Sequence, residues 1–194
     1  MIVSKCDKCG KIANLKWHDS GSPLLPEGWE YMNSINYSNI RDYKYICNTC
    51  CKNSKMKKIY VASSWRNEYH GNIVYRLRIS GHEVYDFKNT ESAFHFSKID
   101  PNWKKWKPEE FIRNINNPIC EKGFQSDFNA MKWADVCILL LPSGRSAHTE
   151  AGWMKGNRKK VYVLMIDKEE PELMYKIYDN IFCKLNDLLE ELLK

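Results

Sequence analysis

The fold of this protein is decided by one stretch of its sequence, Asp135-Val136-Cys137-Ile138-Leu139-Leu140-Leu141-Pro142-Ser143-Gly144-Arg145-Ser146-Ala147-His148-Thr149-Glu150-Ala151-Gly152-Trp153. It begins as a nearly uninterrupted apolar run, turns at Pro-Ser-Gly and continues with helical spacing. This order predicts a buried parallel strand, a tight loop and a helix. Because ligands of open α/β sheets bind at such strand-to-helix turns, we expect a site here.

The only acid in the turn and the start of the predicted helix is Glu150. A helix N-terminus stabilises a carboxylate, and Ser143, Arg145, Ser146 and His148 lie beside it in the sequence. Two interpretations fit this spacing. Glu150 is a functional carboxylate, or the segment is a solvated helix start with a capping serine and a glutamate that only stabilises the helix dipole.

The size and composition of the chain favour one domain of ordinary size with a small appendage. With 194 residues it can form a real core, and its mean hydropathy of −0.58 is typical of soluble globular proteins. We see no apolar run near the roughly 18 residues that a membrane span needs, and no signal peptide at the N-terminus. A cytoplasmic protein without a membrane partner is therefore expected. The net charge of +6 suits an anionic small molecule or nucleic acid, and equally a solvated basic surface.

The cysteines near the N-terminus predict a metal site. Cys6-x-x-Cys9 and Cys47-x-x-Cys50 have the spacing of two zinc knuckles, and cytoplasmic cysteines are not expected to form disulfides. The alternative is a small β-rich lobe with reduced cysteines. Cys51 could replace Cys50 as a ligand. Four cysteines leave no open coordination position, so the predicted Zn²⁺ is structural, and no organic cofactor is expected.

A polar, basic segment, Lys52 to Lys58, marks the predicted domain boundary. It separates a zinc-ribbon-like lobe, residues 1–57, from an α/β domain, residues 58–194, with a parallel sheet of about five strands. The expected strands fall within 58–65, 82–87, 135–141, 160–166 and 180–183, and the expected helices within 67–80, 108–117, 123–134, the segment after Gly144, 170–178 and 186–193. Between them, residues 88–107 form a long aromatic loop that either covers a ligand or packs onto the zinc lobe.

Three segments of residues 58–194 resemble the nucleoside 2-deoxyribosyltransferase superfamily, its nucleotide N-hydrolase relatives and, more remotely, TIR-type NAD glycohydrolases. They are Ile59-Tyr60-Val61-Ala62-Ser63-Ser64-Trp65, Asp127-Phe128-Asn129-Ala130-Met131-Lys132-Trp133-Ala134-Asp135 and Ser143-Gly144-Arg145-Ser146-Ala147-His148-Thr149-Glu150-Ala151-Gly152. The resemblance implies a flavodoxin-like, doubly wound sheet. It also implies a homo-oligomer, because enzymes of this family often complete their sites from a neighbouring subunit.

The same resemblance implies roles for individual residues. Glu150 corresponds to the family's nucleophile, Tyr60 to the tyrosine that holds it, and Asp127 to the acid that assists departure of the base. Taken singly, Tyr60 is equally a core strand residue and Asp127 a helix N-cap with Ser126. The expected substrate-binding residues are Ser63, Ser64, Trp65, Ser143, Gly144, Arg145, Ser146 and His148.

One departure from the family limits what the resemblance implies. The transferases carry a second acid six residues before the glutamate, where this chain has Gly144, and the hydrolases carry a serine there that handles phosphate. In this chain Ser143 and Ser146 flank that position, so any phosphate contact is displaced from the position used by the hydrolases. Transfer to a second base is left open. An exposed salt bridge is an equally good role for Arg145.

We therefore expect an enzyme that cleaves the N-glycosidic bond of a nucleoside or nucleotide, by hydrolysis or by transfer to a second base. Two alternatives stay open. One is a TIR-like NAD glycohydrolase with a signalling role. The other is a protein without catalytic activity that binds a nucleotide, or binds nucleic acid through the zinc lobe and the basic segment, which is less favoured.

Overall fold

The computed structural model of the chain describes residues 56–194 throughout and, before them, only the backbone of six short strands. These strands form three antiparallel pairs, β1 with β2, β3 with β4 and β5 with β6. Their bounds are Val3–Lys5, Ile12–Asn14, Lys16–Trp17, Pro23–Leu24, Trp29–Tyr31 and Tyr45–Cys47. The side chains of the predicted zinc ligands, Cys6, Cys9, Cys47 and Cys50, lie outside the described residues.

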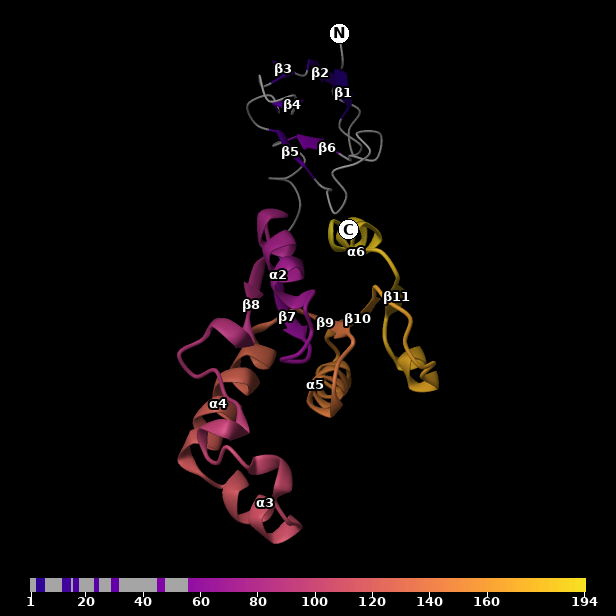
Figure 1. Cartoon of the computed structure of the whole chain (residues 1–194). Coiled ribbons are helices and arrows are strands. Elements are labelled where there is room, and N and C mark those ends of the chain that lie inside the picture. Colours follow the sequence, from indigo (N-terminus) through magenta and orange to yellow (C-terminus); the bar gives the residue numbers. More distant parts are fainter. Residues whose placement is uncertain are drawn as a thin grey trace.

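A five-stranded parallel sheet forms the centre of residues 56–194 (Figure 1). The strands are β7 (Lys58–Ala62), β8 (Glu83–Tyr85), β9 (Val136–Leu141), β10 (Lys160–Met165) and β11 (Asn180–Phe182). Their spatial order, β11-β10-β9-β7-β8, becomes 2-1-3-4-5 when they are numbered along this sheet, which is the flavodoxin-like order. The predicted parallel α/β sheet is confirmed.

Helices cover both faces of this sheet. They are α2 (His70–Ile79), α4 (Pro118–Trp133), α5 (Arg145–Gly156) and α6 (Leu185–Leu192), whereas α3 (Pro108–Ile115) packs against α4. Apolar residues of α2 and α6 pack against one face, and those of α4 and α5 against the other. The helices that follow β8 and β9 in the chain therefore share one side of the sheet, as labelled in Figure 1.

Strand β9, the core of the opening stretch, is buried along its whole length. Its alternate residues point to opposite faces, so Ile138 belongs to the core under α2 and α6, whereas Leu139 belongs to the core under α4 and α5. The same alternation in β7 places Ile59 on the first face and Tyr60 on the second. This alternation decides which side chains can reach the helices α4 and α5.

Two expected helices differ from the structure. Helix α4 begins at Pro118 rather than near Gly123, because the side chain of Asn117 accepts a hydrogen bond from the amide of Ile119 and Pro118 suits the first helical turn. The helix expected over residues 170–178 is wrong. Only a 3₁₀ helix, η5 (Leu173–Ile177), forms there, since Pro171 disfavours a helical Glu170 and Glu172 caps the turn.

The aromatic segment 88–107 is ordered by short 3₁₀ helices and ring contacts. It begins within η2 (Phe87–Asn89) and includes η3 (Phe96–Lys98) and η4 (Trp103–Lys105). Phe94 packs so closely on α4 that a Cβ atom added to Gly123 would lie 2.5 Å from the Phe94 Cβ. This segment is therefore anchored to α4, beside the face of the sheet that carries Tyr60.

The open edge of the sheet at β8 is partly occupied by a side chain from α2. The guanidinium of Arg78 donates a hydrogen bond to the carbonyl oxygen of Val84, 2.9 Å away. On the inner side of the strand, the amide of Glu83 donates to the carbonyl of Lys57. Strand β8 is thus fixed on both sides.

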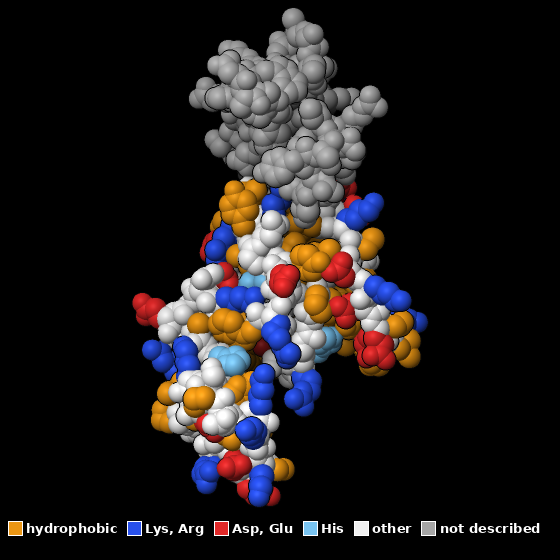
Figure 2. All heavy atoms as spheres, in the orientation of Figure 1, with side chains coloured by type: hydrophobic (Ala, Val, Ile, Leu, Met, Phe, Trp, Pro, Cys, Tyr) orange, Lys and Arg blue, Asp and Glu red, His pale blue; other side chains and the backbone are white. Residues whose placement is uncertain are grey.

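The outer surface of the described part is mixed in character. On the face shown in Figure 2, basic and acidic side chains are interspersed among apolar ones. Within residues 56–194, no helix is both long and apolar enough to cross a bilayer.

Candidate active site

Glu150 lies in the second turn of α5, not at its start. The helix begins after Gly144, which caps it without a side-chain hydrogen bond, and its first turn contains no acid. The expected stabilisation of Glu150 by the helix N-terminus is therefore wrong, and so is the alternative of a capping serine. The Glu150 carboxylate instead accepts a hydrogen bond from the hydroxyl of Tyr60, across from it on β7.

The surroundings of Glu150 favour its neutral form. Burial raises the pKa of Glu150 to about 7, and the negative charge of Asp127 contributes to this increase. The hydrogen bond from Tyr60 acts in the opposite direction and lowers the pKa. Near neutral pH the carboxyl group can therefore exist with or without its proton, as a catalytic carboxyl group requires.

Tyr60 is a core residue whose hydroxyl group donates a hydrogen bond to Glu150. Its side chain is 1% exposed and belongs to the core under α4 and α5. Burial, followed by the charges of Glu150 and Asp127, raises the pKa of Tyr60 well above its ordinary value. The phenol therefore stays neutral and keeps its proton for the hydrogen bond to Glu150.

Asp127 lies in the middle of α4, so the alternative that it caps a helix with Ser126 is wrong: the N-cap of α4 is Asn117. The hydroxyl of Tyr85, from β8, donates a hydrogen bond of 2.8 Å to Asp127 Oδ1. Burial raises the pKa of Asp127, and the bond from Tyr85 lowers it. Two half-buried carboxyl groups from different helices thus interact electrostatically on one face of the sheet.

The loops after β7 and β9 are tied together by side chains. The Ser63 hydroxyl donates to the Leu140 carbonyl at 3.2 Å, and the Asn67 amide donates to the Pro142 carbonyl at 3.0 Å. Ser64 accepts a hydrogen bond from the amide of Arg66. The first predicted binding segment, 63–65, is therefore attached to the loop that precedes α5.

Trp65 is the exposed member of that segment, with 42% of its surface accessible. Its indole meets the rings of Phe87 and His95 edge-on, at centroid distances of 5.3 and 6.4 Å. Since His95 in turn contacts Trp103, the aromatic segment 88–107 continues from Trp65 as a row of rings. These rings join the segment after β7 to the aromatic segment 88–107.

His148 already has partners on both ring nitrogens. Nδ1 lies 2.9 Å from the Gly144 carbonyl oxygen, and Nε2 lies 2.8 Å from the Tyr175 hydroxyl. The neutral ring satisfies both contacts if Nδ1 carries the proton and Nε2 accepts from the tyrosine. In this arrangement His148 fixes the loop at Gly144 to η5, and its predicted role in substrate binding stays a prediction.

The remaining residues of this loop are open to solvent. Arg145 and Ser146 are exposed at the start of α5, and Ser143 is half-buried. A Cβ atom added to Gly144 meets nothing within 4 Å. The loop can therefore accept a larger residue or a ligand group at this position.

Sequence reasoning missed three residues that organise the site: Asn67, Tyr85 and Tyr175. Asn67 precedes a helix, where asparagine often bonds nearby backbone, and this signal was available: its side chain accepts from the amide of Tyr69. Tyr85 and Tyr175 act on residues 42 and 27 positions away in the chain, which no local pattern indicates.

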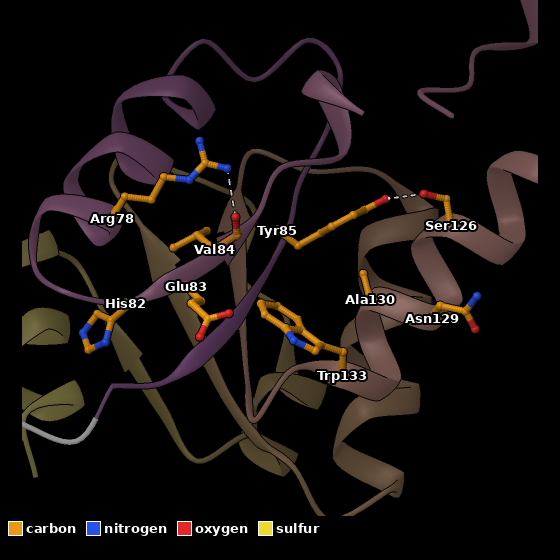
Figure 3. A pocket seen from close by; sticks show the side chains of 9 residues that line it. All are labelled: Arg78, His82, Glu83, Val84, Tyr85, Ser126, Asn129, Ala130 and Trp133. Carbon is orange, nitrogen blue, oxygen red and sulfur yellow. Dashed lines mark hydrogen bonds between the residues drawn. The ribbon is translucent and has the colours of Figure 1, made fainter. Parts of the chain in front are cut away.

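A separate groove of about 640 Å³ lies between β8 and α4. Figure 3 shows its lining, which includes Arg78, Glu83, Asn129 and Trp133, with Tyr85 reaching across to Ser126. None of the candidate catalytic residues, Tyr60, Asp127 and Glu150, lines this groove. The groove is therefore distinct from the carboxyl pair, and Tyr85 is the residue they share.

A metal site is not found in the described part of the chain. Among residues 56–194, no three His, Cys, Asp or Glu side chains are grouped so that they could hold an ion.

Solved structures with a similar arrangement include a 2-deoxyribosyltransferase from Bacillus psychrosaccharolyticus (22% identity, 68% of this chain and 89% of that chain, TM-score 0.46). They also include a CMP N-glycosidase from Clostridium botulinum (18% identity, 70% of this chain and 98% of that chain, TM-score 0.40). A third is a conserved protein from Enterococcus faecalis (16% identity, 71% of this chain and 98% of that chain, TM-score 0.46). No family model and no curated protein matches this chain. At these identities and TM-scores, the similarities establish neither a family nor an activity for it.

Proposed function

We propose that this chain cleaves the N-glycosidic bond of a nucleoside or nucleotide, with Glu150 as the nucleophile. The observation that carries the proposal is the pair Glu150 and Asp127, two interacting half-buried carboxyl groups that are each hydrogen-bonded by a tyrosine. Glycosyl transfer with retention requires two neighbouring carboxyl groups, one ionised as the nucleophile and one protonated as the acid. The sequence resemblance around Tyr60, Asp127 and Glu150 supports the same assignment.

In the proposed first step, an oxygen of ionised Glu150 attacks the anomeric carbon and the bond from that carbon to the base nitrogen breaks. The electron pair of the broken bond stays with the base, which receives a proton from Asp127. The product is a glycosyl ester of Glu150, a free base and ionised Asp127. Tyr60 holds the Glu150 carboxylate for the attack.

In the second step, water or a second base attacks the same carbon and releases Glu150. The proton lost by the attacking nucleophile returns to Asp127, so the enzyme regains its starting state. Hydrolysis and base transfer differ only in this acceptor. The exposed loop around Gly144 is the region where we expect the acceptor to be chosen.

The test is a panel of deoxynucleosides, deoxynucleotides, ribonucleotides and NAD, incubated with the full chain with and without an added acceptor base. We expect a free base, measured by chromatography, from at least one nucleoside or nucleotide. Glu150→Gln should lower the rate by roughly 10³-fold or more, since it removes the nucleophile. Glu121→Gln, an exposed change on α4, serves as the matched control and should keep the parent rate.

The outcome that contradicts the proposal is equally clear. Absence of any free base across the panel, or an unchanged rate for Glu150→Gln, would remove Glu150 as the nucleophile. Nicotinamide release from NAD alone would favour the NAD glycohydrolase alternative. Tight binding of a nucleotide that survives Glu150→Gln without base release would favour a binding protein.

We also propose that Arg145 and Ser146 bind the phosphate of a nucleotide substrate. Both are exposed at the beginning of α5, where backbone amides add to the attraction for an anion. Arg145→Ala should raise the KM for nucleotides by about tenfold and leave the KM for nucleosides unchanged, as expected for a lost charged hydrogen bond. Equal effects on both substrates would contradict phosphate binding.

For the N-terminal residues we propose one structural Zn²⁺ bound by Cys6, Cys9, Cys47 and Cys50. Strand β1, which ends one residue before Cys6 in the sequence, lies beside β6, which ends at Cys47. Metal analysis of the purified chain should give one zinc per molecule. Cys50→Ser should lose it and Cys51→Ser should keep it, whereas the reverse result would make Cys51 the ligand.

A further inference from the structure

We propose that Tyr85 is a positioning residue that keeps the Asp127 carboxyl group in place while this group gives up and regains its proton. The inference rests on the proposed function, in which Asp127 protonates the departing base. Tyr85 touches neither the base nor the sugar in this scheme. It acts through Asp127.

The inference rests on one hydroxyl group that lies between two hydrogen-bond partners. Tyr85 Oη is 2.8 Å from Asp127 Oδ1 and 2.9 Å from Ser126 Oγ, and Figure 3 shows the tyrosine side chain reaching from β8 to α4. A tyrosine hydroxyl has one hydrogen to donate and can also accept one. Its hydrogen can therefore point to either partner.

This arrangement fits both protonation states of Asp127. When Asp127 is ionised, Tyr85 donates to Oδ1 and accepts the hydrogen of Ser126. When Asp127 is protonated on its other oxygen, Oδ2, that hydrogen is available to the departing base, and the Tyr85 hydrogen can turn to Ser126 Oγ because the neutral Oδ1 is a weaker acceptor. The number of protons differs by one between the two states, and only hydrogens change place. The heavy atoms of the acid stay where the reaction needs them.

The ring of Tyr85 is held firmly enough for this role. It stacks on Tyr60 with a centroid distance of 5.6 Å and an interplanar angle of 11°. Its neighbours in the chain are fixed from α2, since Arg78 bonds the carbonyl of Val84 and His70 lies 2.8 Å from the carboxylate of Asp86. Tyr85 therefore contacts the tyrosine that holds Glu150 and also the second carboxyl group.

The other ionisable groups around the pair are few. Glu150 faces Asp127 from α5, Tyr60 faces both from β7, and the buried thiol of Cys137 on β9 lies near Glu150. No cation among the described residues shifts the pKa of Asp127 or Glu150. The hydroxyl of Thr90 lies beside that of Tyr85 but has no hydrogen bond of ordinary geometry.

The experiment uses two substitutions with opposite predicted effects. Tyr85→Phe removes the donor to ionised Asp127 and should raise the pKa of Asp127. Ser126→Ala, made together with Thr90→Val so that no other hydroxyl replaces Ser126, leaves Asp127 as the only acceptor for Tyr85 and should lower it. Each shift should be about half a pH unit or more, which is the effect of one hydrogen bond.

The shifts are read first in the pH profile of kcat for base release, where the limb that belongs to Asp127 should move up in pH for one variant and down for the other. The kcat of Tyr85→Phe should fall about 10-fold to 100-fold with little change in KM, because only the proton transfer is affected. Tyr162→Phe, which removes a buried hydroxyl on the opposite face of the sheet, is the control and should change neither quantity.

A second measurement works without turnover. Carbon-13 NMR titration of the Asp127 carboxyl group, assigned by its loss in Asp127→Asn, gives the same pKa directly. If the parent releases no base, the proposed function fails while the titration still tests Tyr85. Shifts in the same direction, or no shift in either variant while thermal unfolding stays at the parent value, would overturn the role of Tyr85.

Discussion

The two faces of the central sheet are built from the same strands but from different kinds of residue. Towards α2 and α6, the strands present large aliphatic side chains such as Ile59, Ile138 and Leu140, and α6 adds four leucines. Towards α4 and α5, the buried residues are often small, including Ala62, Ala130, Ala134, Ala147 and Ala151, and they surround tyrosines. Both faces are buried, yet only the second holds Asp127 and Glu150.

This difference shows how one sheet divides stability from chemistry. Large aliphatic side chains fill most of the first face, and the carboxylate buried beside it, Asp86, is paired with His70 of α2, since an unpaired carboxylate there would cost several kcal/mol. Small residues let helices approach the sheet and leave room for tyrosines. A tyrosine buries its ring and offers a hydroxyl, so the face under α4 and α5 can hold carboxyl groups with partners.

The largest effect that tests this division is expected from Asp127→Asn. The amide cannot donate a proton as an acid, so release of an unactivated base should slow by roughly 10² to 10⁴-fold. A substrate whose leaving group needs no proton should be affected far less. Asp187→Asn, in the first turn of α6 on the aliphatic side, is the matched control. Equal slowing of both kinds of substrate would mean that Asp127 acts in another way.

On the aliphatic face, Leu188→Ala should affect stability alone. Leu188 is completely buried on α6, and its truncation should lower the free energy of unfolding by about 2 to 5 kcal/mol. Urea unfolding measures this loss, and the rate of base release per folded molecule should equal that of the parent. A large loss of rate at unchanged stability would contradict the separation of the two faces.

A smaller effect is predicted for the pH dependence of stability. The folded pKa of Glu150, about 7, lies above its ordinary value of 4.5, so the folded protein holds a proton that the unfolded chain releases. This contribution is fully present below pH 4.5 and is lost as the pH rises to about 7. Glu150→Gln stays neutral, so its stability relative to the parent should grow across this window by about 3 kcal/mol.

Urea unfolding of both proteins at several pH values measures this difference. Over the same pH range, from 4.5 to about 7, the rate of base release should rise, because base release requires ionised Glu150. A stability difference between the two proteins that does not depend on pH would show that Glu150 is solvated like an ordinary surface carboxylate.

The smallest predicted effect is at Gly144. This residue caps α5 without a side chain, its surroundings are open, and its φ of −103° suits any residue. Gly144→Asp should therefore stabilise the protein by a few tenths of a kcal/mol, whereas Gly144→Ala should destabilise it slightly, since alanine caps helices poorly. Thermal unfolding distinguishes the two. Destabilisation by both would mean that the loop needs glycine for another reason.

The sheet could be predicted because its signals are local. The apolar run at 136–141 and the strands at 58 and 160 were evident from composition, and the alternation with helices predicted parallel strands. The helix expected over residues 170–178 is absent for a local reason too, because Pro171 disfavours a helical Glu170. The early start of α4 was indicated by Asn117-Pro118, a cap followed by a residue suited to the first turn.

The partners of the carboxyl groups could not be predicted in the same way. Tyr60 and Asp127 were identified from the family resemblance, but no periodicity relates Tyr85 to Asp127 or His148 to Tyr175. These contacts depend on how α4 and η5 approach the strands, which is a property of packing. The position of Glu150 within α5 likewise depended on where the helix begins, and one turn of difference changes its partner from backbone amides to Tyr60.

The bond between Arg78 and Val84 has a consequence for how the protein behaves at high concentration. Backbone groups of alternate residues in a strand point to opposite sides, so in the three residues of β8 only Val84 turns its carbonyl outward. With that acceptor occupied by a guanidinium, the edge offers too few free groups to pair with a strand from another molecule. We therefore expect Arg78 to oppose edge-to-edge pairing of two chains at β8.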